Sequence, residues 1–121
     1  MGLSAGLSVG LPFGAGFHGS FNMLKQKVQL LKKQAEGYII PLGKLNLVFV
    51  ITDIGFIGCG AFDIMMLDKY NYPAVKAKSH DGGPIDGIEK LLAGVVREVN
   101  ESGSKLGIKT GMPINQAIEL L

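Results

Sequence analysis

The sequence contains a single cysteine, Cys59, among its 121 residues. One thiol cannot form a disulfide within the chain, and it cannot supply a zinc site that is built from several cysteines. The lack of both features fits a reducing cytoplasm, which is where we expect the protein. Cys59 is then either a packed apolar side chain or a functional group.

Excess charge of either sign is also missing. Twelve Lys and Arg residues against ten Asp and Glu residues leave a formal net charge of +2. Proteins that neutralise a phosphate backbone need a dense basic surface, so we predict no nucleic-acid partner. A hydrophobic share of 47% is ordinary for a globular chain, and this length is enough for one domain with its own core.

Residues 1–22 contain no Lys, Arg, Asp or Glu. Four of their glycines recur at every fourth position: Gly2, Gly6, Gly10 and Gly14. This spacing occurs where membrane helices pack closely, but Pro12 and the scarcity of large apolar residues argue against a membrane span. A secretory signal would place positive charge before its apolar stretch, and none is present. We predict a flexible glycine-rich extension or an upstream start here, followed by one domain over residues 23–121.

Apolar patterning predicts a β-rich first half. Residues 24–42 indicate two short strands that are joined by a turn near Lys32 and Lys33. Residues 45–52 (LNLVFVIT) are almost continuously apolar, which predicts a central strand covered on both faces. The turn-forming residues 53–55 precede another apolar run over residues 56–60, so this pair is expected to form an antiparallel hairpin.

Helices are predicted mainly in the second half. Asp63 suits the N-cap of a short helix over residues 64–70, and residues 74–78 alternate as a strand. Pro84 suits the first helical position of a helix that Gly94 ends. Its apolar face would comprise Ile85, Ile88, Leu91, Leu92 and Val95. Residues 95–99 favour a strand, and Pro113 opens a final helix. The prediction is an α+β fold with a mostly antiparallel sheet packed by three or four short helices.

Six short segments follow one another in an order and spacing that carry a family resemblance. They are GYIIPL at residues 37–42, Asn46-Leu47, Gly58-Cys59-Gly60, Leu91-Leu92, KLGI at residues 105–108 and Gly111-Met112. Over residues 35–121 the chain resembles the YunC-like domain of unknown function, a prokaryotic family. The resemblance implies an α+β domain whose N-terminal β region mediates tetramer formation, and it carries over no accepted catalytic residue.

The sequence departs from that family pattern at two positions. Pro113 stands where relatives tend to have a small polar helix cap. Gly103 lies in a segment where relatives usually favour alanine, and glycine lowers the helix propensity of the short helix expected there.

Cys59 is the principal candidate for a functional residue. It lies between Gly58 and Gly60, where a strand is expected to end before the helix that follows Asp63. Backbone N–H groups at a helix start favour a thiolate, and flanking glycines allow a substrate to approach the backbone. These features indicate a nucleophile. The alternative is that Cys59 fills the core, since free cysteine is among the most buried residue types.

A cysteine nucleophile requires a base, and His80 is the one histidine within the region of resemblance. It precedes Asp81, Gly82 and Gly83, which either help to bind a ligand or form an ordinary turn with side-chain caps. Cys59, His80 and Asp81 have no paired ligand spacing, so we predict neither a metal site nor a cofactor. Asn46, inside an apolar strand, either orients a ligand or bonds a neighbouring loop.

Three functions remain open at this point. The first is a cytoplasmic homo-oligomeric binding or accessory protein with a small-molecule pocket near Gly58, Cys59, Gly60 and residues 79–83. The second is a thiol-dependent enzyme in which Cys59 attacks an acyl or similar electrophile and His80 acts as base. The third is a subunit scaffold that has neither ligand nor reactivity.

Overall fold

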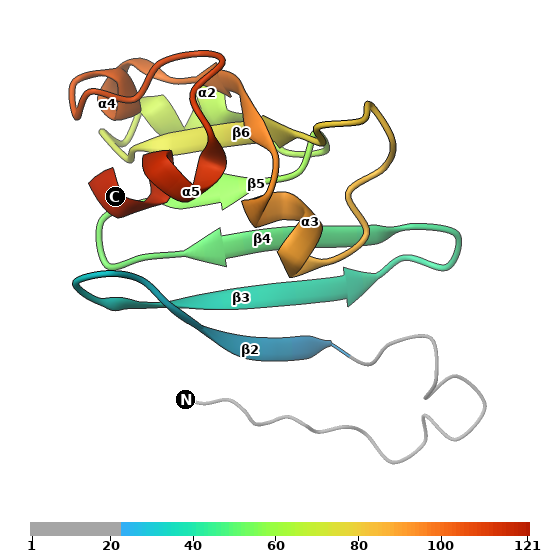
Figure 1. The fold of residues 1–121 in the computed structure, drawn as a ribbon. Coiled ribbons are helices and arrows are strands. Elements are labelled where there is room, and N and C mark those ends of the chain that lie inside the picture. The colour runs from blue at the N-terminus through green and yellow to red at the C-terminus, as the bar shows by residue number, and fades with distance from the viewer. Residues whose placement is uncertain (1–22) are drawn as a thin grey trace.

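A computed structural model describes residues 23–121, and the prediction of a glycine-rich extension over residues 1–22 lies outside the described part. Six strands form one sheet in the order β2-β3-β4-β5-β6-β7, so neighbours in the sheet are neighbours in the chain (Figure 1). The strands are β2 (Leu24–Gln29), β3 (Gln34–Pro41), β4 (Asn46–Ile51), β5 (Phe56–Gly58), β6 (Ala74–Lys78) and β7 (Val95–Val99). The helices are α2 (Ile64–Asp68), α3 (Ile88–Leu92), α4 (Glu101–Ser104) and α5 (Ile114–Ala117), followed by the 3-10 turn η3 (Ile118–Leu120).

The strand pairing confirms the predicted α+β class and its mostly antiparallel sheet. All neighbouring strands pair antiparallel except β5 and β6, which are parallel and are connected through α2. The predicted hairpin of residues 45–60 forms, and its turn is closed by a hydrogen bond from the Thr52 backbone N–H to the Gly55 carbonyl at 2.9 Å. In the residues described, no helix is long and apolar enough to cross a membrane.

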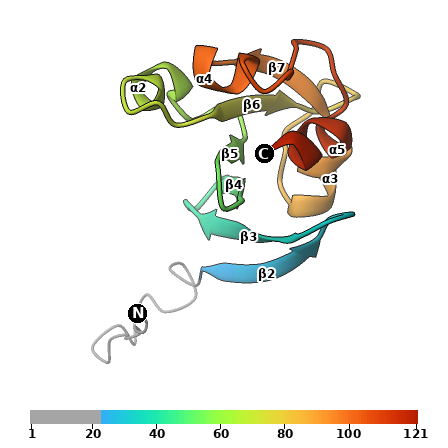
Figure 2. The ribbon, with the colours of Figure 1, turned by 90° about the vertical axis from the view of Figure 1, so that its left-hand side faces the viewer.

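The main core lies between one face of the sheet and helices α3 and α5. Figure 2 shows these two helices on one side of the sheet and α2 on the other. Alternate strand residues such as Val48, Val50 and Ile57 point into this core and are fully buried. Ile88 and Leu91 of α3 cover them, as the predicted apolar face of that helix requires.

The opposite face of the sheet is covered only in part. Helix α2 lies over β5 and β6, where Phe56, Ile64 and Ala74 form a second cluster with Phe62. Over β3 and β4, within residues 23–121, no helix covers the sheet. Five apolar side chains there, which we call the open sheet face, are half-buried or exposed: Tyr38, Ile40, Leu47, Phe49 and Ile51. The prediction that β4 is covered on both faces is therefore wrong for its outer face.

Two predicted helix starts are confirmed. The Asp63 side chain accepts hydrogen bonds from the backbone N–H groups of Met65 and Met66, both at 3.2 Å, so it caps α2. Pro113 occupies the N-cap of α5 instead of the first helical position. Its carbonyl accepts from the Gln116 and Ala117 backbone N–H groups.

The predicted start of α3 at Pro84 is wrong, because the helix begins at Ile88. Gly87 is the N-cap and has an extended backbone, with φ −158° and ψ 169°. Ile85 still packs against the core, but from a segment without regular secondary structure, and the apolar spacing does not distinguish this segment from a helix. The prediction that the helix ends before Gly94 is supported. Close packing requires glycine at this position, because a Cβ there would lie 2.3 Å from the Lys78 carbonyl oxygen.

Helix α4 forms in spite of Gly103. The residue is buried, and a Cβ added to it would lie 2.7 Å from the Val99 Cγ2 atom. The Asn100 side chain caps the helix by accepting a hydrogen bond from the Gly103 N–H at 2.9 Å. Capping and close packing thus offset the low helix propensity of glycine.

Candidate functional site

Cys59 directly follows β5 and is buried, with 8% of its surface exposed. Its backbone N–H donates to the Val48 carbonyl at 3.0 Å, which extends the β4–β5 pairing by one residue. The backbone around the thiol is thus fixed by the sheet. This position confirms the predicted strand end. The burial of Cys59, taken by itself, favours the alternative that its side chain fills the core.

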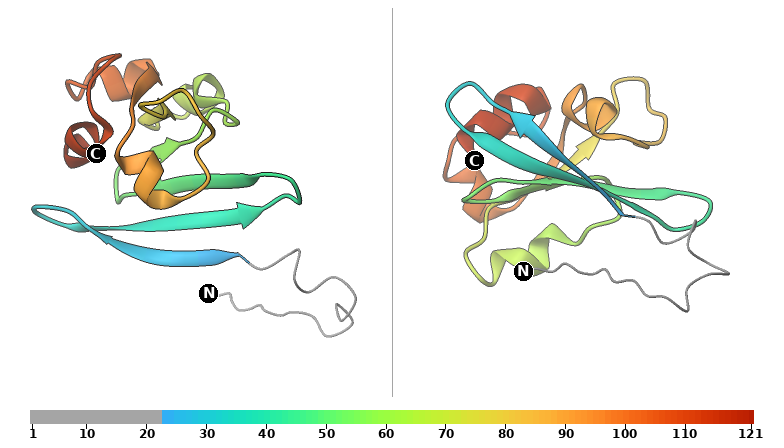
Figure 3. Two further views of the ribbon diagram at one scale, coloured as in Figure 1. Left: turned by 45° about the vertical axis from the view of Figure 1, so that its right-hand side comes forward. Right: turned by 90° about the horizontal axis from the view of Figure 1, so that it is seen from below.

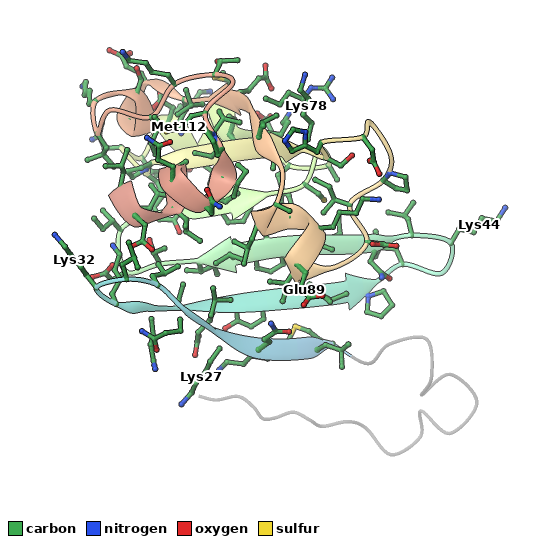
Figure 4. All side chains as sticks on the ribbon, in the orientation of Figure 1. Lys27, Lys32, Lys44, Lys78, Glu89 and Met112 are labelled. Carbon is green, nitrogen blue, oxygen red and sulfur yellow. The ribbon has the colours of Figure 1, made fainter. Side chains whose placement is uncertain are left out.

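Cys59 also lines a hollow of about 430 Å³, which we call the Cys59 hollow. Three segments that are distant in sequence form it: the β3–β4 turn, the chain after β5 and the chain before α3. Its lining residues are Gly43, Lys44, Leu45, Asn46, Cys59, Gly60, Ala61, Pro84, Ile85 and Asp86. Figure 3 (left) shows that the segment leading into α3 approaches the β3–β4 end of the sheet. Side chains are drawn in Figure 4, where Lys44 extends outward from the β3–β4 turn.

The β3–β4 turn shapes one wall of the hollow. The Leu42 N–H donates to the Leu45 carbonyl at 2.7 Å, and Gly43 adopts a positive φ of 87°. Glycine takes this conformation without the steric cost that a side chain would bring. Leu45 is 56% exposed and presents an apolar surface beside the polar start of β4.

Asn46 begins β4 on the face that also carries Val48 and Val50. Its side-chain Nδ2 donates to the Asp86 carbonyl at 3.2 Å, so it bonds the neighbouring segment, which is one of the two roles predicted for it. Within residues 23–121 the side-chain oxygen of Asn46 has no hydrogen-bond partner. Asn46 therefore lines the Cys59 hollow with one hydrogen-bond acceptor not used within residues 23–121.

The two glycines beside Cys59 have different surroundings. A Cβ at Gly58 would lie 2.5 Å from the Phe62 ring, so Gly58 is required for packing beneath the aromatic cluster and does not line the hollow. Gly60 lines the hollow, and a Cβ there would meet no atom within 4 Å. Only Gly60 therefore faces space that a ligand would use.

Residues 79–83 form a turn that closes on itself. The Gly83 N–H donates to Asp81 Oδ1 at 2.9 Å, the Gly82 N–H donates to the Ser79 carbonyl at 3.3 Å, and the Ser79 hydroxyl donates to the Gly83 carbonyl. The hydrogen bond from Gly83 is the main cause that lowers the pKa of the Asp81 carboxyl. Asp81 also lies 3.7 Å from the Lys90 ammonium.

His80 is exposed within this turn, and neither His80 nor Asp81, Gly82 or Gly83 lines the Cys59 hollow. The structure thus brings together Asn46, Cys59 and Gly60 among the predicted site residues and leaves the others outside. The N–H groups at the start of α2 are bonded to the Asp63 carboxylate. Within residues 23–121 no group of three or more His, Cys, Asp and Glu side chains is placed to hold a metal ion.

A second hollow, also of about 430 Å³, lies on the other side of the segment that precedes α3. Its lining residues are Gln26, Ile39, Asp86, Gly87, Ile88, Glu89 and Lys90. Sequence reasoning missed this hollow. The available signal was Gln26, a polar residue on the face of β2 that carries Val28 into the core.

Sequence reasoning also missed Asn100, whose role is structural. It is 1% exposed, and its side-chain Nδ2 donates to the carbonyls of Ile64 and Tyr72. Its Oδ1 accepts from Ala74 and Gly103. An Asn between an apolar strand and a helix is a recognisable N-cap signal.

The fold defines a small α+β domain with a mixed six-stranded sheet. Residues 58–121 match the family described as Domain of unknown function (DUF1805). The chain is also 32% identical over 82 residues to the uncharacterized protein YunC of Bacillus subtilis (strain 168), a match that covers 65% of this chain and 77% of that protein. The chain therefore belongs to the DUF1805 family, and the YunC-like resemblance is confirmed.

A solved structure shares the same architecture. The crystal structure of a protein of unknown function from Thermoplasma acidophilum superimposes with a TM-score of 0.72. The match covers 81% of this chain and 91% of that one at 20% sequence identity, so it supports the fold alone.

Proposed function

We propose that this protein is a homo-oligomeric cytoplasmic binding or accessory protein that takes a small molecule in the Cys59 hollow. One observation carries the proposal. Asn46 and the Cys59-Gly60 pair come from two separate parts of the chain and line the same hollow of about 430 Å³. That volume lies in the range of small-molecule sites, which are mostly apolar with a few polar groups that fix orientation.

The lining defines the ligand chemistry that the hollow favours. Leu45, Pro84 and Ile85 offer apolar surface, and the side-chain oxygen of Asn46 offers a hydrogen-bond acceptor. A ligand with an N–H or O–H donor beside a small apolar group would satisfy both. The hollow is open to solvent, which fits reversible binding better than permanent capture of a cofactor.

A thermal-shift screen of small molecules tests this proposal. A ligand at 100 times its Kd stabilises the folded state by about 2.7 kcal/mol, which raises the melting temperature by several degrees for a domain of this size. The variant Gly60→Leu should abolish the shift, because it fills the hollow where no atom lies within 4 Å. Gly87→Leu adds the same group in the second hollow and serves as the matched control. A screen without any shift in the wild type contradicts the proposal.

Self-association is supported by the open sheet face and, within residues 23–121, by the sheet edge at β2. Tyr38, Phe49 and Ile51 present apolar surface that a second copy would bury. The rim of this surface is polar, with Lys25 bonded to Glu36 at 3.3 Å and lying over the Tyr38 ring. A central apolar patch with a polar rim is the usual anatomy of a protein interface.

Light scattering at micromolar concentration measures the subunit number, and a sharp monomer peak would contradict an oligomer. Ile51→Lys should weaken association, because it places a charge on the open sheet face. The fold should tolerate this change, since residue 51 is directly opposite Glu36 across the strand pair. Ile54→Lys, at an exposed apolar residue in the neighbouring turn, is the control and should leave the subunit number unchanged.

Thiol-dependent catalysis is the second candidate, because Cys59 lines the hollow. The support is weaker, since His80 does not line the hollow and, within residues 23–121, Asp86 is the one His, Asp or Glu residue that does. The rate of Cys59 alkylation across a pH series distinguishes this candidate from a binding role. Where an activity is found, an unchanged rate in Cys59→Ser would exclude the thiol as its nucleophile.

A further inference from the structure

The chain between β6 and α3 consists of two parts that are held differently. Residues 79–83 form the closed turn described above. Residues 84–87 belong to neither a helix nor a strand and connect that turn to α3. Within residues 23–121, the one hydrogen bond that reaches residues 84–86 is donated by the Asn46 side chain to the Asp86 carbonyl at 3.2 Å. This bond is exposed to solvent.

Residues 84–87 separate the Cys59 hollow from the second hollow. Pro84 and Ile85 line the first, Gly87 lines the second, and Asp86 lines both. Displacement of this segment would therefore join two spaces of about 430 Å³ each. Only Ile85, which is half-buried, ties the segment to the apolar core.

One end of the segment is suited to rotation. Gly87 ends it and has the backbone freedom of glycine, whereas Gly83 before it is held in the closed turn by its hydrogen bonds with Asp81 and Ser79. Around Gly87 no atom lies within 4 Å of a Cβ position. Helix α3 begins directly afterwards and is fixed by the burial of Ile88, so movement would be confined to the segment itself.

We propose that residues 84–87 form a movable strap over Cys59 and that the Asn46 amide holds the strap in its closed position. Release of the Asn46–Asp86 hydrogen bond opens the Cys59 hollow toward the second hollow and admits larger molecules. The use of the strap in ligand entry rests on the proposed function, but the strap itself is testable without any ligand.

The key variant is Asn46→Asp, which keeps the shape of the side chain and replaces the donor by an acceptor that repels the Asp86 carbonyl. Within residues 23–121 the amides of residues 85–87 donate no hydrogen bond, so their backbone order parameters follow the segment directly. These should fall in Asn46→Asp to below about 0.6, the range of a flexible backbone. Leu45→Ala is the matched control, because it widens the Cys59 hollow and leaves the Asn46–Asp86 bond intact. It should leave the order parameters of residues 85–87 unchanged.

Alkylation of Cys59, the single thiol, gives a second readout. A bulky maleimide should react several-fold faster with Asn46→Asp than with the wild type, whereas the small reagent iodoacetamide should gain less. Unchanged hydrogen exchange at Val48 and Val50, which are fully buried, would exclude general unfolding as the cause. Equal order parameters for residues 85–87 in Asn46→Asp and wild type would overturn the strap. A failed ligand screen with lowered order parameters would instead count against the binding function alone.

Discussion

Asn100 and Ala74 are joined by two hydrogen bonds that run in opposite directions. The Asn100 backbone N–H donates to the Ala74 carbonyl at 3.1 Å, and the Ala74 N–H donates to Asn100 Oδ1, also at 3.1 Å. This pair fixes the start of β6 against the end of β7. The parallel β5–β6 pairing depends on the same residues, because Ala74 is directly opposite Phe56.

Asn100→Ala should lower the free energy of unfolding by about 2–4 kcal/mol, because it leaves buried N–H and C=O groups without partners. Urea denaturation measures the change. Asn115→Ala, at an exposed position of α5, is the control and should lie within about 0.5 kcal/mol of the wild type. Equal stability of Asn100→Ala and Asn115→Ala would show that the Asn100 network is not needed for stability.

Asp68 and Ser102 should make stability depend on pH. The Ser102 hydroxyl and backbone N–H donate to Asp68 Oδ1 at 2.7 and 2.9 Å, and the hydroxyl is the main cause that lowers the pKa of this carboxyl. A lowered folded-state pKa contributes stability above the ordinary carboxyl value of about 3.9, and this contribution is lost as the pH falls through the lowered value.

Ser102→Ala should therefore be less stable than the wild type at pH 7, and the difference should shrink below about pH 4. Urea denaturation at pH 7 and pH 3 measures both values. Ser104→Ala, in the same helix, is the control and should show no such dependence. A difference that grows toward acid pH would reverse the inferred role of Asp68.

Gly103→Ala should destabilise the protein by about 1–3 kcal/mol, although alanine is the better helix former. The reason is the 2.7 Å approach between the added Cβ and Val99 Cγ2, since a β-branched side chain next to the backbone has little freedom to move. The double variant Val99→Ala with Gly103→Ala should recover part of the loss, measured as a double-mutant cycle. Additive losses would mean that the contact does not limit substitution at residue 103.

Native Cys59 should be alkylated at least roughly tenfold more slowly than the denatured protein, because the residue is buried, with 8% of its surface exposed. Intact mass across a pH series follows the single reaction. Rapid native alkylation with a midpoint well below the ordinary thiol value of about 8.5 would instead indicate an activated thiolate. That outcome would move thiol-dependent catalysis ahead of the binding role.

Much of the fold could be predicted because its signals are local. The apolar run of β4, the turn at residues 53–55 and the Asp63 cap each lie within a few residues of the structure that they specify. The segment before α3 was not predictable in this way. Ile85 reaches the core from a segment without regular secondary structure, and a single apolar residue near Pro84 suits a helix equally well.

The candidate site could be predicted only where an unusual residue stood in an apolar context. Asn46 and Cys59 were found for this reason, whereas Leu45 and Asp86 became neighbours only through folding over about forty residues. The residue types of Asp81, Gly82 and Gly83 suggested a ligand site, but their contacts are those of a turn. Whether such residues line a hollow or only form a turn is decided by the packing of the whole chain, which no short sequence pattern encodes.

The two edges of the sheet differ in a way that limits how large any edge-paired assembly can become. The start of β7 is already bonded to residues 111–114, with the Gly111 N–H donating to Val96 and the Val96 N–H donating to Met112, both at 2.8 Å. Within residues 23–121, edge pairing along a whole strand can therefore use β2 only. Two copies of residues 23–121 joined along β2 leave no equivalent edge for a third, so this route ends at a dimer and does not propagate into a fibre.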